Sequence, residues 1–132
     1  MIVKEIMNNN IYYIDSSENI KFALKQMHAL GVQRLFIFDN DDKPIGLISY
    51  KDIILLVGSE KTKIDIDNVK VEDIMNDHIN IIDAYATVQD AANLILRSET
   101  SELLVIENNE NIGVITKTDI CRVVSFSELT PK

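Results

Sequence analysis

The sequence predicts an α/β (α+β) fold made of two β-α-β-β-α copies, and three observations support this. The segment GLISYKD at 46–52 recurs as GVITKTD at 113–119. The similarity covers most of the chain, because the matching segments VKEIM and VEDIM begin at Val3 and Val71, 68 residues apart. Helical and strand spacings of apolar residues follow in the same order in both copies. Because each half is too small to bury a face well alone, we expect the two to pack together.

The first copy, residues 1–57, contains readable elements. The apolar run 11–14 predicts a short strand, and Asn19 is a suitable N-cap for a helix over 20–30 that Gly31 would end. Residues 34–38 and 44–48 predict a hairpin around the polar turn 39–43. A second helix is predicted from residue 50 to about residue 57.

The second copy, residues 71–124, repeats this order. Thr87 and Asp90 have the spacing of a capping box and predict a helix that runs to about Arg97. Residues 102–107 and 111–115 predict a hairpin, and residues 117–124 a closing helix. The polar segment 58–70 is interpreted as a connector between the copies, and the tail 125–132 is expected to be partly disordered.

The composition narrows the classes of function. The 132 residues carry a net charge of −8, which disfavours binding to nucleic acid. No stretch approaches the roughly 20 apolar residues of a membrane span, and the first ten residues lack a signal-peptide pattern, so a cytoplasmic location is expected. One cysteine and two histidines exclude an internal disulfide and disfavour a zinc site, so no metal site is expected. No activated nucleophile is evident, and no catalytic residue is predicted.

The repeated motif has two interpretations. An aspartate one turn into a helix, Asp52 or Asp119, suits two adjacent ribose hydroxyls, and the preceding Ser49 or Thr116 lies beside free backbone N–H groups that suit phosphate. The same spacing also describes a capping box with no ligand. The motif alone leaves both interpretations open.

The complete pattern resembles the tandem CBS-domain pair, or Bateman module. V-x-x-I-M, a short strand, a helix, a hairpin and G-h-h-[ST]-x-x-D appear in this order twice. The resemblance implies that each repeat is a three-stranded sheet with two helices, and that the repeats pack through their sheets about a pseudo-two-fold axis. It further implies a homodimer without catalysis that binds an adenosine compound (AMP, ADP, ATP or S-adenosylmethionine) as a regulatory ligand and acts on an unidentified enzyme or transporter.

The resemblance also implies two clefts, which differ in this chain. The position before the hairpin that faces the phosphates holds Arg34 in the first copy and Glu102 in the second. Because a guanidinium binds phosphate and a carboxylate repels it, the first cleft is the expected nucleotide site. Its expected residues are Arg34, Leu47, Ser49, Asp52, His78, Ile79 and Asn80. The second cleft, expected to be empty or to take a less negative ligand, has Asn10, Ile11, Tyr12, Val114, Thr116 and Asp119.

Two alternatives remain from other classes of function. The chain is a ligand-free dimerisation scaffold if the motifs only cap helices. It is a metal-dependent phosphate-ester enzyme, the less favoured alternative, if Asp52 and Asp119 hold a metal ion.

Overall fold

The computed structural model describes residues 1–58 and 65–126, which form two compact units. Unit 1 combines residues 1–11 with the chain from Asn80 onward, and unit 2 runs from Tyr12 to Ile79. We call residues 1–11 and 71–79 the opening segments, because each begins a sequence repeat. Each opening segment lies in the unit formed by the rest of the other repeat. The ranges 1–57 and 71–124 therefore describe sequence repeats, and the compact units cut across them.

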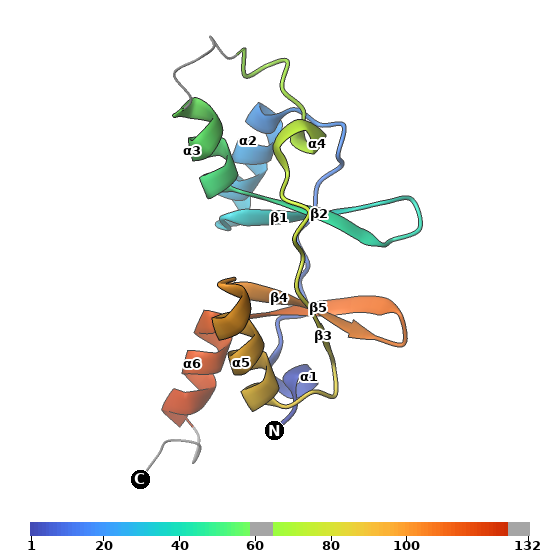
Figure 1. Ribbon diagram of the computed structural model, residues 1–132, viewed down its shortest axis with the longest axis vertical. Helices are drawn as coiled ribbons and strands as arrows, with labels where there is room; N and C mark the ends of the chain where they lie inside the picture. Colours follow the sequence, from blue (N-terminus) through green and yellow to red (C-terminus); the bar gives the residue numbers. More distant parts are fainter. Residues whose placement is uncertain (59–64, 127–132) are drawn as a thin grey trace. The chain divides into compact units, whose positions relative to one another are not determined.

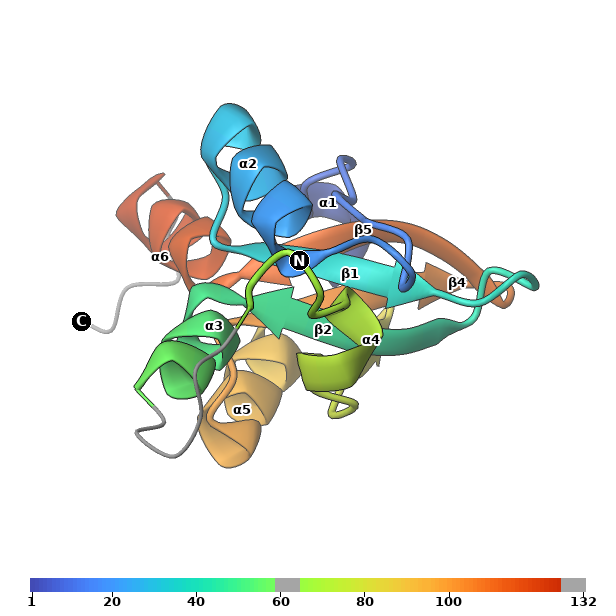
Figure 2. The same cartoon turned by 90° about the horizontal axis from the view of Figure 1, so that it is seen from above.

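Unit 2 contains α2 (Ile20–Leu30), β1 (Arg34–Phe38), β2 (Pro44–Ser49), α3 (Tyr50–Val57) and α4 (Val71–Ile74). β1 and β2 form an antiparallel hairpin. Residues 12–14 run parallel to β1 as a third extended segment, because Ile14 N–H donates to the Phe36 carbonyl and Phe36 N–H to the Tyr12 carbonyl, both at 2.9 Å. All three helices lie on one face of the hairpin (Figure 1). Seen from above, α2 lies beside β1, and α3 and α4 beside β2 (Figure 2).

Unit 1 contains α1 (Val3–Ile6), β3 (Ile81–Asp83), α5 (Val88–Ser98), β4 (Glu102–Glu107), β5 (Glu110–Thr116) and α6 (Lys117–Phe126). Its sheet has the order β3-β4-β5, with β3 parallel to β4 and β4 antiparallel to β5. Helices α5 and α6 lie on one face of this sheet (Figure 1). The predicted mixture of helices and strands in two similar halves is confirmed.

Local signals in the sequence set the ends of the longer helices. Asn19 caps α2 by accepting a hydrogen bond from Phe22 N–H at 2.8 Å, and Gly31 ends it with a left-handed φ of 68°. At α5, Asp90 N–H donates to Thr87 Oγ1 at 3.0 Å and Thr87 N–H donates to Asp90 Oδ2 at 3.2 Å, which is the predicted capping box. The predicted bounds of these helices agree with the structure to within a residue.

Two short helices were absent from the predicted elements. α1 and α4 contain the V-x-x-I part of the repeated V-x-x-I-M pattern, and each has only four residues. Four residues are too few to show a helical period. Their first residues, Val3 and Val71, are fully buried. The pattern therefore encodes a buried anchor as well as a helical turn.

The predicted connector and tail are only partly described. Residues 59–64 of the connector and 127–132 of the tail lie outside the described residues. In the described part of the connector, the Val69 carbonyl accepts Ile20 N–H at 3.0 Å, and Ile66 packs against the core of unit 2. Residues 125–126 belong to α6.

Each unit has its own apolar core, completed by the valine of an opening segment. Because these valines come from the other repeat, neither repeat holds a complete core alone. The buried core of unit 2 consists of Ile14, Ile20, Ala23, Met27, Leu35, Ile37, Ile48, Ile53 and Val71. The buried core of unit 1 consists of Val3, Ile82, Ala84, Ala91, Ile95, Leu103, Val105 and Ile115.

Candidate functional site

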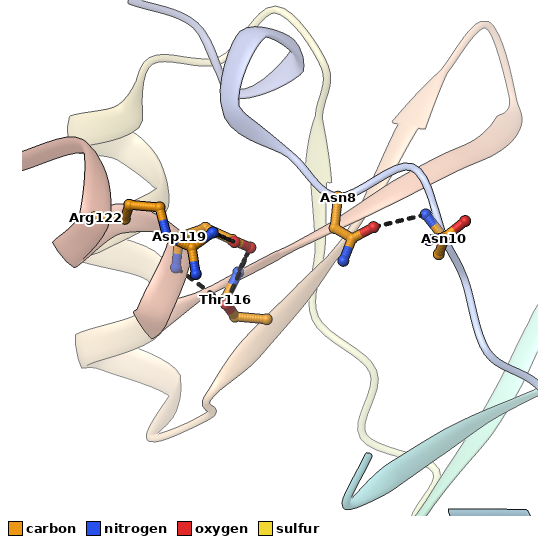
Figure 3. A network of polar contacts seen from close by, with 5 residues as sticks. All are labelled: Asn8, Asn10, Thr116, Asp119 and Arg122. Carbon is orange, nitrogen blue, oxygen red and sulfur yellow. Dashed lines mark hydrogen bonds and ion pairs between the residues drawn. The ribbon is translucent and has the colours of Figure 1, made fainter. Parts of the chain in front are cut away.

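Both copies of the motif form complete capping boxes. The backbone N–H and hydroxyl of Ser49 both donate to Asp52 Oδ2, at 2.9 and 3.0 Å, and Asp52 N–H donates to Ser49 Oγ at 3.4 Å. The same bonds join Thr116 and Asp119 at 2.9, 3.0 and 3.1 Å (Figure 3). In each box the second carboxylate oxygen, Oδ1, takes no part. The capping interpretation therefore describes both motifs, and one acceptor of each aspartate lies outside the cap.

The opening segments lie directly beside the motifs. Asn76 pairs with Leu47 through two backbone hydrogen bonds of 2.8 Å, and Asn8 pairs with Val114 in the same way at 2.8 and 2.9 Å. The Asn76 side chain then accepts His78 N–H at 2.8 Å. The Asn8 side chain likewise accepts Asn10 N–H at 2.9 Å (Figure 3). These turns fix the backbone next to the motifs.

The motif glycines allow this close approach. A Cβ built on Gly113 would lie 2.7 Å from the Asn8 carbonyl oxygen and 2.6 Å from Met7 Sδ. A Cβ on Gly46 would lie 2.5 Å from Met75 Sδ. In each unit the repeated glycine therefore packs against the repeated methionine of the opening segment, and at Gly113 a Cβ would also meet the backbone of that segment.

Most residues of the preferred site belong to unit 2. Arg34 pairs across the β1–β2 hairpin with Ser49, the N-cap of α3, so the two side chains leave their strands on the same face of the hairpin. The side chain of His78 is 90% exposed, and its Nε2 lies 3.9 Å from Asp77 Oδ1. The structure thus groups Arg34 with Ser49 and Asp52 and leaves the His78 imidazole in solvent. The set is divided as follows: Arg34, Leu47, Ser49, Asp52, His78 and Ile79 lie in unit 2, and Asn80 is the first residue of the second segment of unit 1.

The second set belongs mainly to unit 1. Glu102 pairs with Thr116 across β4–β5, in the place that Arg34 and Ser49 hold in unit 2. The strand pairing therefore sets an acidic residue opposite this motif. The set is divided as follows: Asn10, Ile11, Val114, Thr116 and Asp119 lie in unit 1, and Tyr12 in unit 2.

Three residues beside the motifs were missed. Asn8 and Asn76 follow the repeated methionines, so the motif V-x-x-I-M-N would have revealed them. Arg122 Nη1 lies 4.0 Å from Asp119 Oδ1, with the two side chains 66% and 14% exposed (Figure 3). Its counterpart in the first repeat is Leu55, which is 65% exposed, so no repeated pattern marks Arg122.

An ion-pair cluster holds the first opening segment on unit 1. Lys4 Nζ lies 2.8 Å from Glu107 Oε2, and the Tyr85 hydroxyl donates to Glu107 Oε1 at 2.7 Å. The hydrogen bond from Lys4 lowers the pKa of Glu107, and the Glu107 carboxylate raises the pKa of both Lys4 and Tyr85. The equivalent residues of unit 2, Asp39 and Glu72, are both acidic, so this pairing of opposite charges belongs to unit 1.

Two general features bear on the candidate functions. Within residues 1–58 and 65–126, no group of three or more His, Cys, Asp or Glu side chains is placed to hold a metal ion. The metal-dependent alternative therefore has no ligand cluster in that part of the chain. None of the helices in these ranges has the length and apolar character needed to cross a bilayer.

Similar proteins were found by sequence and by structure. A CBS domain-containing protein of Dictyostelium discoideum is 27% identical over 128 residues, which cover 91% of this chain and 88% of that protein. A protein of Methanocaldococcus jannaschii is 25% identical over 133 residues, which cover 93% of this chain but 32% of that protein, so the chain spans about a third of that relative's length. The solved structure of CBSX2 in complex with AMP has a TM-score of 0.80 at 24% identity, covering 95% of this chain and 96% of that one.

The duplicated motif also agrees with a family model. The CBS domain model matches residues 3–59 and again residues 71–125, which together include both capping boxes and both opening segments. The chain therefore belongs to the CBS domain family and carries two copies of the domain in tandem.

Proposed function

We propose that the chain is a regulatory module that binds an adenosine nucleotide at the Ser49 motif. The observation that carries this proposal is the grouping of Arg34, Ser49 and Asp52 at the start of α3. A helix N-terminus and a neighbouring guanidinium favour a phosphate group. Asp52 Oδ1, which the capping box does not use, is an acceptor for a ribose hydroxyl. The AMP complex of CBSX2, which has a similar fold, supports this choice of ligand.

The two motifs differ in their preference for negative charge. Arg34 stands opposite Ser49, whereas Glu102 stands opposite Thr116. A phosphate at the first motif gains an attractive partner, and a phosphate at the second meets a carboxylate. We therefore assign the nucleotide to the first motif. Leu47 and the backbone of residues 78–79 would contact its base, because Leu47 pairs with Asn76 just before them.

The regulatory step is a shift between conformations or assemblies. A ligand at the first motif contacts residues 78–79, which lead directly into Asn80 of unit 1. If one arrangement of this connection binds the ligand more tightly, binding shifts the population toward it. An enzyme or transporter that senses this shift is the proposed regulated partner.

The proposed assembly is a homodimer that covers α3. Three apolar side chains of this helix, Ile54, Leu55 and Val57, are 65% to 68% exposed. Large apolar side chains exposed together on one helix are typical of interfaces between proteins. Their counterparts on α6 are Cys121, Arg122 and Val124, so the exposed face of α3 is more apolar than the equivalent face of α6.

A ligand-free scaffold remains the second candidate function. It is favoured by the capping boxes, which stabilise α3 and α6 without any ligand. In this case the exposed face of α3 would be the functional surface.

Isothermal titration separates the two candidates. The protein is titrated with AMP, ATP and S-adenosylmethionine, and with GMP as a control for phosphate and ribose without adenine. The proposal expects saturable binding of at least one adenosine compound and weaker binding of GMP. Absence of binding by all three adenosine compounds at millimolar concentration would favour the scaffold.

A further inference from the structure

Helix α3 is apolar around most of its circumference. On the inner side, Ile53 is 5% exposed and Leu56 packs against the core of unit 2. The other apolar residues of this run, Ile54, Leu55 and Val57, are 68%, 65% and 67% exposed. A helix at a protein surface normally carries polar residues on its outer face. Three large apolar side chains in that position indicate that another surface covers α3.

The equivalent helix α6 has an ordinary outer face. Ile120 packs against the core of unit 1, as Ile53 does in unit 2. Arg122 occupies the position of Leu55, and its side chain is 66% exposed. A charged side chain at this position is what a helix that faces water requires. The outer faces of the two helices therefore suit different surroundings.

A second copy of the chain has two helices of this kind to offer. If its α6 covered α3, the guanidinium of Arg122 would lose water beside Ile54 and Leu55, whose side chains cannot accept a hydrogen bond. If its α3 covered α3, each apolar face would remove the other from water. This second contact is the same from both sides, as a dimer with two-fold symmetry requires.

The charges along α3 favour an antiparallel pair. Lys51, Ile54, Leu55 and Gly58 are all exposed, and their spacing of three and four positions places them on one stripe of the helix. In an antiparallel pair centred between Ile54 and Leu55, Lys51 of one copy would meet Gly58 at the C-terminal end of the other α3. That end is the negative end of the helix dipole. In a parallel pair, two Lys51 ammonium groups would face and repel each other.

We propose that the chain forms a two-fold homodimer in which α3 of one copy packs antiparallel against α3 of the other. The partner of this surface is thus unit 2 of a second copy of the chain. The inference rests on the homodimer of the proposed function, and it adds the helix that covers α3 and the direction in which that helix runs.

Crosslinking of the full-length protein with a short bismaleimide tests this pairing. Cys121→Ser removes the single native thiol, and Leu55→Cys then places one thiol on α3. This double variant should give a covalent dimer. Leu96→Cys in the same Cys121→Ser background is the matched control and should stay unlinked, because Leu96 is 75% exposed but lies on α5. A mixture of the Leu55→Cys protein with the wild type, whose thiol is on α6, detects the alternative pairing of α3 with α6.

Paired charges provide a second measurement. Leu55→Glu and Leu55→Arg should each sediment mainly as monomers, because like charges would meet in the α3 pair. An equal mixture of the two variants should recover the dimer and associate about tenfold or more tightly than either variant alone, because opposite charges then face each other. A contact between α3 and α6 predicts the reverse for Leu55→Glu, since its carboxylate would pair with Arg122 and strengthen the dimer.

The outcomes separate this inference from the proposed function. A self-linked Leu55→Cys dimer that exceeds the mixed product supports the α3 pair. A mixed product that equals or exceeds the self-linked one overturns it. A protein that sediments as a dimer but gives neither product has another interface, which also overturns it. If the wild type sediments only as a monomer, the homodimer of the proposed function fails as well, whereas its nucleotide binding is still judged by the titration.

Discussion

Gly113 and Gly46 hold the same place in the two motifs but have different neighbours. A Cβ at Gly113 would collide with the carbonyl oxygen of Asn8, a backbone atom, at 2.7 Å. At Gly46 the contact below 3.0 Å is with Met75 Sδ, the flexible end of a side chain, and the Asn76 carbonyl oxygen is 3.4 Å away. A side chain can turn aside more easily than a paired backbone.

We therefore expect Gly113→Ala to destabilise the protein more than Gly46→Ala. Gly113→Ala should lower the free energy of unfolding by about 1 to 3 kcal/mol, which is typical of overpacking at a site that cannot relax. Urea unfolding of the two variants and the wild type measures this free energy. An equal loss of unfolding free energy in both variants would show that the Asn8 backbone moves as freely as the Met75 side chain.

Contacts between residues three or four positions apart in the sequence were predictable, whereas contacts between residues far apart in the sequence were not. Asn19, Gly31 and both capping boxes work within one helical turn, so their spacing in the sequence identifies them. Lys4 meets Glu107 across 103 positions, and no local pattern links them. The place of Arg122 beside Asp119 is local, but a lone i,i+3 pair on a helix surface is too common to indicate a site.

At the scale of elements, the opening segments decide which strands and helices share a core. Residues 1–11 join unit 1 through Val3 and Lys4, whose N–H groups donate to the Ala86 and Ala84 carbonyls at 2.8 and 2.9 Å. The sequence predicted the longer helices and hairpins from their periods. It did not predict that each opening segment packs in the other unit, because V-x-x-I-M begins each repeat, whereas its packing partners lie in the other repeat.

The ion pair between Lys4 and Glu107 should make the attachment of residues 1–11 depend on pH. The folded pKa of Glu107 is below its ordinary value of 4.5, so its contribution is present above 4.5 and is lost as the pH falls through the folded pKa. The folded pKa of Lys4 is above 10.5, so its contribution is present below 10.5 and is lost as the pH rises through the folded value.

Hydrogen exchange of the Val3 and Lys4 amides measures this dependence. Glu107→Gln should exchange faster than the wild type at neutral pH, and the two proteins should converge at pH values well below 4.5. Each comparison is made at one pH, so the intrinsic pH dependence of exchange cancels. A difference that persists unchanged in acid would assign the effect of the substitution to packing rather than charge.

At the scale of the whole molecule, the stability of each unit depends on both repeats, because each unit includes the opening segment of the other repeat. Val71 is fully buried in the core of unit 2, although it begins the second repeat. Val71→Ala should therefore reduce the exchange protection of Leu35 and Ile48 in unit 2, by about 1 to 3 kcal/mol of local stability. Val3→Ala should do the same to Leu103 and Ile115 in unit 1. If Val71→Ala instead lowers the hydrogen-exchange protection of Leu103 and Ile115 more than that of Leu35 and Ile48, each repeat packs with its own opening segment.

The proposed homodimer depends on the exposed face of α3. Leu55→Glu places a charge within that face and should shift the protein toward a monomer in analytical ultracentrifugation, because a buried carboxylate without a partner is costly. Leu96→Glu on α5 is the control, since Leu96 is 75% exposed and lies on another helix. Loss of the dimer in the control variant alone would move the interface to α5.

The central claim is that the first motif binds the nucleotide, and AMP titration of two matched variants tests it most directly. Asp52→Asn and Asp119→Asn each keep a side-chain oxygen that can accept the cap hydrogen bonds, so both helices should persist. We expect Asp52→Asn to lose about tenfold or more in AMP affinity, as for a lost hydrogen bond to a charged group, and Asp119→Asn to stay close to the wild type. A larger loss in Asp119→Asn than in Asp52→Asn would contradict the assignment.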